Sequence, residues 1–264
     1  MSLVNPFVSN SKVNSSIANT LEVIDNKYSI DGWTFPSSED PSQNRNPLYY
    51  HNGDHTRMVI DDTLLLSEGL GLTSMETNIA VMAASNHDIE QDLVELGANE
   101  SASRRLLEEE LSKLGFSRVA IMAGGLAITG TTPRFEDGTI VQRAVEQCYP
   151  TKRAELIAHA VAGADVGRLF GSFGPLLSHK LFLELQTKNQ IPVTIQELIK
   201  FQNNQIDFLE NYQYPTKEIE NLLSTNRAGA IKHIIKLIRN LESGQIAKFE
   251  EVIQQDLEFI HKTS

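Results

Sequence analysis

The stretch IAHAVAGADV, residues 157–166, places a single carboxylate, that of Asp165, among small and apolar residues. The spacing of the apolar residues favours a buried helix over about 151–169. An ionised carboxylate is costly to bury unless a cation or a metal ion compensates its charge. Asp165 therefore predicts either an ion pair, with Arg168 one helical turn further on as the nearest partner, or a metal site.

Helical spacing also dominates outside this stretch, and alternation typical of strands is scarce. A capping box, in which Thr73 caps and Glu76 reciprocates, predicts the start of a helix that continues to Asp88. Further helices are predicted over about 11–27, 50–70, 100–114, 117–124, 137–148, 175–189 and 215–224, from Thr194 onward, and twice more before the C-terminus. The sequence therefore predicts an all-α multi-helix bundle.

The composition of the chain changes after about residue 190, where Gln, Asn, Lys, Ile and Glu predominate. We predict one helical domain over residues 1–190 and additional C-terminal helices over 191–264, packed on the same unit. The segment from Gly32 to Pro47 is rich in Pro, Ser, Asn and Asp and predicts a long loop. This loop is either a lid over a substrate or a surface excursion.

Bulk properties limit the classes of function. The chain has 264 residues, of which 41% are hydrophobic, enough for a sizeable core. Its formal net charge of -11 argues against non-specific binding to DNA, RNA or anionic membranes. A single cysteine, no secretory leader and no apolar run approaching 18 residues predict a soluble, cytoplasmic protein. The oligomeric state stays open, a homo-oligomer included.

Two other stretches carry candidate ligands. In YHNGDH, residues 50–55, His51 and His55 would lie one turn apart on a helix face. They could bind one metal together, or one could bind the metal while the other serves a substrate. In AASNHD, residues 83–88, His87 and Asp88 place a nitrogen ligand beside an oxygen ligand. The alternative for this pair is that it only ends the helix, with Asp88 bonded to the backbone.

The order of these residues, a histidine, a His-Asp pair and a later aspartate, resembles the HD superfamily of metal-dependent phosphohydrolases. YHNGDHTRMV, residues 50–59, is similar to the YHNxxHxxxV segment of the cyclic-nucleotide phosphodiesterases in that superfamily. GANESASRRLLEEELSKLG, residues 97–115, resembles the Asn-Glu-x-x-Ser-Ala helix of a bacterial group of predicted HD-superfamily hydrolases. The resemblance covers roughly residues 45–170 and implies an HD-type helical bundle.

The resemblance also implies a metal centre and its chemistry. It makes His51 a general acid that protonates the leaving oxygen, and it gives Asp88 a catalytic role, with the option of bridging to a second metal. Imidazole and carboxylate ligands suit divalent Mn, Fe, Zn, Ni or Co better than Ca, and Mg is also compatible with the set. The implied metal ligands are His55, His87, Asp88 and Asp165.

The implied activity is hydrolysis of a phosphate ester, of a nucleotide or a related small molecule, by metal-activated water. Small phosphate esters are thus the expected partners, and neither nucleic-acid polymers nor membranes are expected. A metal-dependent oxygenase on the same type of fold and a non-catalytic helical binding module are the alternatives. Phosphate also needs a positive partner, and Arg45, in the long loop, is the predicted substrate-binding residue.

The sequence departs from the family in three places. Only one histidine, His159, lies between Asp88 and Asp165, and its predicted role is structural. Gln91 stands where nucleotidase members have a catalytic glutamate, which weakens the transfer of 5′-nucleotidase activity. Ser85 and Asn86 stand where the bacterial group has aromatic residues.

Overall fold

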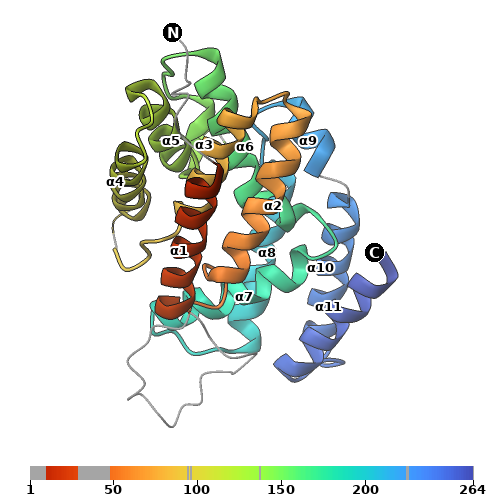
Figure 1. The fold of residues 1–264 in the computed structure, drawn as a ribbon. Helices are drawn as coiled ribbons and strands as arrows, with labels where there is room; N and C mark the ends of the chain where they lie inside the picture. The colour runs from red at the N-terminus through yellow and green to blue at the C-terminus, as the bar shows by residue number, and fades with distance from the viewer. Residues whose placement is uncertain are drawn as a thin grey trace.

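The structure is a computed structural model that describes residues 10–28, 48–93, 95, 97–136, 138–223 and 226–263. Within these ranges the chain forms eleven α-helices, two short strands and two 3-10 turns, so the predicted all-α bundle is confirmed (Figure 1). The helices are α1 (Asn10–Tyr28), α2 (Gly53–Gly69), α3 (Ser74–Asn86), α4 (Ala98–Lys113), α5 (Arg118–Gly130), α6 (Lys152–Gly167), α7 (Gly174–Lys188), α8 (Ile195–Asn211), α9 (Lys217–Leu223), α10 (Arg227–Glu242) and α11 (Phe249–Thr263).

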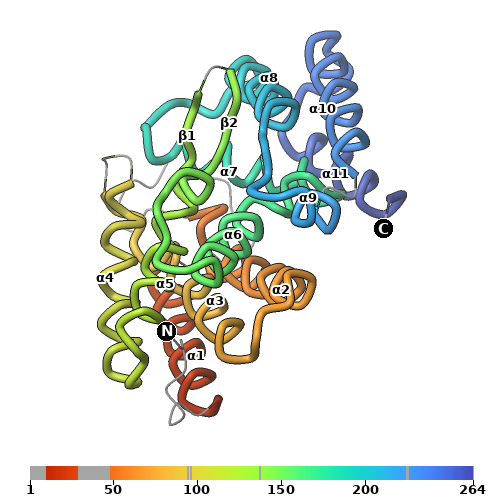
Figure 2. Tube along the Cα trace, turned by 90° about the horizontal axis from the view of Figure 1, so that it is seen from above, coloured from red at the N-terminus to blue at the C-terminus, as the bar shows by residue number. Residues whose placement is uncertain are grey.

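The predicted helix over 137–148 is wrong. Strands β1 (Pro133–Glu136) and β2 (Thr139–Gln142) form an antiparallel hairpin there, and a 3-10 turn (Arg143–Val145) follows. Gly138 has a φ of 78°, a left-handed conformation that a helix does not contain. The β-branched residues that follow it favour a strand. Figure 2 shows β2 beside the end of α8.

The start of α2 also differs from the prediction. The helix begins at Gly53 and not near Tyr50, because Asn52 is its N-cap. The side-chain oxygen of Asn52 accepts the backbone N–H groups of Asp54 (3.0 Å) and His55 (3.2 Å). His51 therefore precedes the helix, and the expectation that it shares a helix face with His55 is wrong.

The predicted capping box at the start of α3 is present, and it also joins α3 to α6. The backbone N–H of Thr73 donates to Glu76 Oε2 (2.8 Å), and the Thr73 hydroxyl caps the N–H of Glu76. Arg153, in the first turn of α6, donates from Nε to Glu76 Oε1 (2.7 Å) and from a second nitrogen to Oε2. The N-terminal ends of α3 and α6 are thus bonded to each other.

Alanines allow α3 and α6 to approach closely within the first apolar core. The core also receives side chains from α1, α2, α4, α5 and α9. On the two helices the fully buried alanines are Ala80, Ala83, Ala84, Ala154, Ala158, Ala160 and Ala162. Close approach of these helices matters because each carries a candidate metal ligand at or just beyond its C-terminal end.

A second apolar core holds α7, α8, α10 and α11 together, and Tyr49 and Tyr50 from the segment before α2 pack into it. Asp256 of α11 is fully buried here between two histidines. His179 of α7 donates from Nδ1 to Asp256 Oδ2 (2.5 Å), and His233 of α10 donates from Nε2 to Oδ1 (2.7 Å). Helix α7 precedes residue 190 and shares this core with helices that follow it. The predicted division of the chain at residue 190 stays a prediction.

In the described ranges, the helices lack the length and apolar character needed to cross a membrane. The predicted loop from Gly32 to Pro47, with Arg45, lies outside the described residues.

The capping box generates a stability prediction. Arg153 lowers the pKa of the Glu76 carboxyl from 4.5 to about 2, against the effect of burial. The ionised form therefore stabilises the fold above pH 4.5, and this contribution is lost as the pH falls toward 2. We expect Glu76→Gln to lower the free energy of unfolding at pH 7 by about 1.5 kcal/mol, because solvent around Arg153 screens part of the ion pair.

Urea unfolding of both proteins between pH 7 and pH 3 measures this difference, which should shrink as the pH falls. Glu155→Gln is the control, because Glu155 forms its ion pair with the exposed Lys152 one turn away in the same helix. It should cost less than about 0.5 kcal/mol. A Glu76→Gln loss no larger than that of the control would contradict the assignment.

Candidate metal centre

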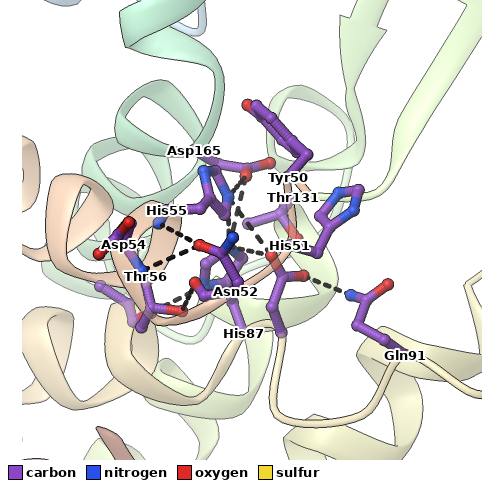
Figure 3. A network of polar contacts seen from close by, with 12 residues as sticks. Tyr50, His51, Asn52, Asp54, His55, Thr56, His87, Gln91, Thr131 and Asp165 are labelled. Atoms are coloured by element: carbon purple, nitrogen blue, oxygen red, sulfur yellow. Dashed lines mark hydrogen bonds and ion pairs between the residues drawn. The ribbon is translucent and has the colours of Figure 1, made fainter. Parts of the chain in front are cut away.

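Four side chains from three helices meet in one buried cluster. His55 comes from the first turn of α2, and Asp165 from the last turn of α6. His87 caps the C-terminal end of α3, and Asp88 follows it. Each offers one ligand atom, and these atoms lie within 4.8 Å of one another. Figure 3 shows His55, His87 and Asp165 pointing toward a common centre. The sequence had singled out the same four residues.

The ligand atoms face one another at short range. His87 Nε2 lies 3.0 Å from Asp88 Oδ2 and 3.4 Å from Asp165 Oδ1. His55 Nε2 lies 3.3 Å from each of the same two oxygens, and also 3.3 Å from His87 Nε2. Both histidines are buried, and the Asp165 side chain is 19% exposed. A single cation at the centre would be within reach of two nitrogens and two oxygens.

The tautomer of the neutral His87 ring fits a cation at the centre of the cluster. Its Nδ1 lies 2.7 Å from the carbonyl oxygen of Ala84. A carbonyl oxygen only accepts hydrogen bonds, so Nδ1 carries the hydrogen and Nε2 of the neutral ring presents a lone pair to the cluster. Asp88 Oδ2, which it faces, is buried and makes no hydrogen bond of ordinary geometry. Lone pairs that converge in this way require a positive charge between them.

The directions of the pKa shifts in the cluster also indicate that the two carboxylates need a positive charge beside them. Burial raises the pKa of Asp88 and of Asp165, but the neighbouring histidines lower both by more, so both carboxylates stay ionised. Burial lowers the pKa of His87, yet Asp88 and Asp165 raise it well above its usual range. Without a metal ion, a proton on Nε2 of His87 would compensate the carboxylates, and a bound metal ion would supply this charge in its place.

Polar side chains outside the cluster hold the two carboxylates in place. Gln91 donates from Nε2 to Asp88 Oδ1 (2.7 Å), and Gln142 donates from Nε2 to Asp165 Oδ2 (3.3 Å). The hydroxyl of Tyr212 donates to Gln142 Oε1 (2.6 Å), which fixes the orientation of that amide. Each carboxylate thus keeps one oxygen for the centre and has the other hydrogen-bonded, as supported metal ligands do.

Two helix C-termini also face the centre. His87 stands at the end of α3, and Asp165 lies in the last turn of α6. The C-terminal end of a helix carries a partial negative charge, which favours a cation nearby. The scaffold therefore adds to the attraction that the side chains exert on a metal ion.

His51 lies beside the cluster without belonging to it. Its ring centroid is 5.7 Å from that of His55, and its side chain is 25% exposed. Its Nδ1 donates to Glu184 Oε1 (2.5 Å), while Glu184 Oε2 accepts the backbone N–H groups of Tyr50 (2.8 Å) and His51 (3.0 Å). Glu184 on α7 therefore fixes both the position of His51 and the nitrogen that carries its inner hydrogen.

The charge of Glu184 also changes the acidity of His51. Burial lowers the pKa of the His51 imidazole, but Glu184 and Asp88 together raise it to about 9. His51 is thus protonated near neutral pH, with Nε2 as the nitrogen whose proton can face a substrate. Burial raises the pKa of Glu184, but His51, with its side chain and its backbone N–H, and Lys188 together lower it by more, to about 2.

Glu184 and Gln142 are functional residues that the sequence did not predict. Glu184 stands in LFLELQ, residues 181–186, where a carboxylate interrupts an apolar run. This signal is the one that singled out Asp165, and it could have identified Glu184 too. Gln142 was assigned to a helix that does not form, so no local pattern pointed its side chain toward Asp165.

The arginine alternative for Asp165 is wrong. Arg168 instead pairs with Asp62 of α2, with Nη2 2.8 Å from Oδ1. His159 bonds through Nε2 to the carbonyl oxygen of Ala144 (3.1 Å), in keeping with its predicted structural role. The predicted substrate contact of Arg45 lies outside the described residues.

Comparison with known proteins adds no relative: no protein-family model, curated protein or solved structure matches the chain. The resemblance to the HD superfamily thus stays a prediction from the residues themselves.

The geometry predicts that metal ions stabilise the protein. A divalent ion such as Mn²⁺ at about 100 times its dissociation constant should raise the free energy of unfolding by about 2.7 kcal/mol. His87→Ala should abolish this rise, because it removes a ligand. Thermal unfolding with and without Mn²⁺, Zn²⁺ and Fe²⁺, together with elemental analysis, measures both effects.

His159→Ala is the matched control, since it removes another buried histidine close to Asp165 in sequence. This variant should start from a lower stability and still gain the full rise. The same metal-dependent rise in His87→Ala as in the wild type would exclude this cluster as the binding site.

Proposed function

We propose that the chain is a metal-dependent phosphohydrolase of the HD type, which cleaves a phosphate ester of a nucleotide or a related small molecule. One observation carries the proposal: a buried cluster of two imidazoles and two carboxylates lies beside a histidine that a buried glutamate orients. The cluster suits a cation, and the adjacent histidine suits proton transfer. Metal-assisted hydrolysis of a phosphate ester with a protonated leaving oxygen uses both.

His55, His87, Asp88 and Asp165 would hold the metal, and their mixed nitrogen and oxygen atoms suit divalent Mn, Fe, Zn, Ni, Co or Mg. A divalent ion bound there would lower the pKa of a water molecule and polarise a phosphoryl oxygen. Asp88, through its bond from Gln91, would hold its second oxygen away from the centre. This arrangement would keep one oxygen of Asp88 available for the metal.

His51 would act as the general acid. Because Nδ1–H is engaged by Glu184, the proton that His51 can transfer is the one on Nε2. Transfer of that proton to the departing oxygen neutralises the alkoxide as the ester bond breaks. His51 is placed for this role because it precedes the helix of His55 and is fixed instead by α7.

Variants of the acid and its partner test the mechanism. We expect His51→Gln to lower kcat by about 10²- to 10⁴-fold with unchanged metal content, because it removes the proton donor and leaves the ligands in place. Glu184→Gln should lower kcat by less, since the imidazole remains. The assay follows phosphate or nucleoside release from phosphomonoesters, cyclic nucleotides and nucleoside triphosphates, with each of the candidate metals.

His261→Gln, on the exposed side of α11, is the control and should retain full activity. Oxygen uptake without ester cleavage would favour the oxygenase alternative. Metal binding without any turnover would favour a binding module. An unchanged kcat in His51→Gln would remove His51 from the mechanism.

A further inference from the structure

A continuous chain of polar contacts runs from the metal cluster to His51 and passes through Lys188. Gln91, which donates to Asp88, lies with its Oε1 3.4 Å from Lys188 Nζ. The same Nζ lies 3.3 Å from Glu184 Oε1, the oxygen that also accepts from His51. Lys188, in the last turn of α7, therefore stands between a metal ligand and the proposed general acid.

Glu184 does not hold Lys188 firmly. Its Oε2 already accepts two backbone N–H groups, and its Oε1 accepts the shorter bond from His51. The contacts of Lys188 Nζ with Glu184 and with Gln91, at 3.3 and 3.4 Å, are both long for charged donors. An ammonium has three N–H donors, so Lys188 keeps the capacity to bind another acceptor.

Three other cations among the described residues are each paired with carboxylates. Lys27 pairs with Glu90 (3.1 Å) and Asp92 (3.3 Å). Arg57 pairs with Asp25, and Arg168 with Asp62, each through two nitrogens. Among the residues that the structure describes, Lys188 is the lysine that joins the chain of contacts between Asp88 and His51.

Lys188 is more exposed to solvent than the Glu184 carboxylate that it contacts. The Lys188 side chain is 27% exposed, whereas the Glu184 side chain is fully buried. A ligand that approached from solvent would therefore meet the ammonium and not the carboxylate. The flexible four-carbon stem lets Nζ shift toward an incoming anion while α7 stays fixed.

We propose that Lys188 is a substrate-binding residue that donates to the phosphoryl oxygens of the ester. The inference rests on the proposed function and adds to it a cation from α7. A metal ion on one side and an ammonium on the other would share the negative charge of the phosphoryl group, while His51 faces the leaving oxygen. Lysine is suited to this role as a compact, movable positive charge.

Lys188→Met tests the proposal with inorganic phosphate as the probe. Because the substitution removes the charge and keeps most of the stem, we expect phosphate to inhibit hydrolysis at least tenfold more weakly. The KM for the ester should rise by a similar factor, with metal content unchanged. Lys188→Arg should restore most of the phosphate affinity, and inhibition of the wild type should depend more on salt than inhibition of Lys188→Met.

Lys262→Met is the matched control, because the ion pair of Lys262 with Glu258 lies within α11. Its phosphate inhibition should equal that of the wild type. Equal inhibition of the wild type and Lys188→Met would overturn the proposal, as would a loss in Lys188→Met that Lys188→Arg does not restore.

Calorimetry with inorganic phosphate and metal-loaded protein separates this proposal from the proposed function. If the wild type cleaves no ester, the hydrolase assignment fails, and phosphate binding still decides the role of Lys188. At least tenfold weaker binding to Lys188→Met would then support a phosphate contact. Equal binding, or no binding to the wild type, would reject it.

Discussion

The structure depends on two carboxylates, those of Asp88 and Asp165, which face the same buried point as two imidazoles. Ionised carboxylates repel each other, and burial removes the water that would screen them. His87 cannot offset this charge in its neutral form, because its one hydrogen is held by the carbonyl oxygen of Ala84. The cluster therefore requires a positive charge at its centre.

The positions of α3 and α6 show how the fold meets this constraint. Asp88 lies twelve positions after Glu76, and Asp165 lies twelve positions after Arg153. Since the first members of these pairs are bonded to each other and the second members meet at the cluster, the two helices run parallel for about 18 Å. The Glu76–Arg153 ion pair joins the N-terminal ends of α3 and α6. It thus helps to align Asp88 with Asp165 near the opposite ends of these helices.

Helix α7 links the second core to the candidate metal centre. On one side, His179 bonds to the buried Asp256 and so holds α11 in the second core. One and a half turns further along, Glu184 orients His51 beside the metal cluster, and Lys188 follows one turn later. The C-terminal helices therefore take part in the site indirectly, because they fix the helix from which the proposed acid and the proposed phosphate contact are positioned.

The sequence by itself determined the helical class of the protein and the capped start of α3, because helical periodicity and a capping box depend on interactions within a few residues. The buried setting of Asp165 also followed from the sequence, whereas the full set of four candidate ligands came from the resemblance to the HD superfamily. Only the tertiary structure decided that His51 is held by Glu184, which lies 133 residues away, and that Gln142 supports Asp165 from a hairpin. Local spacing reports which face of a helix is buried, but it carries no information on which distant side chain the packed helices bring against that face.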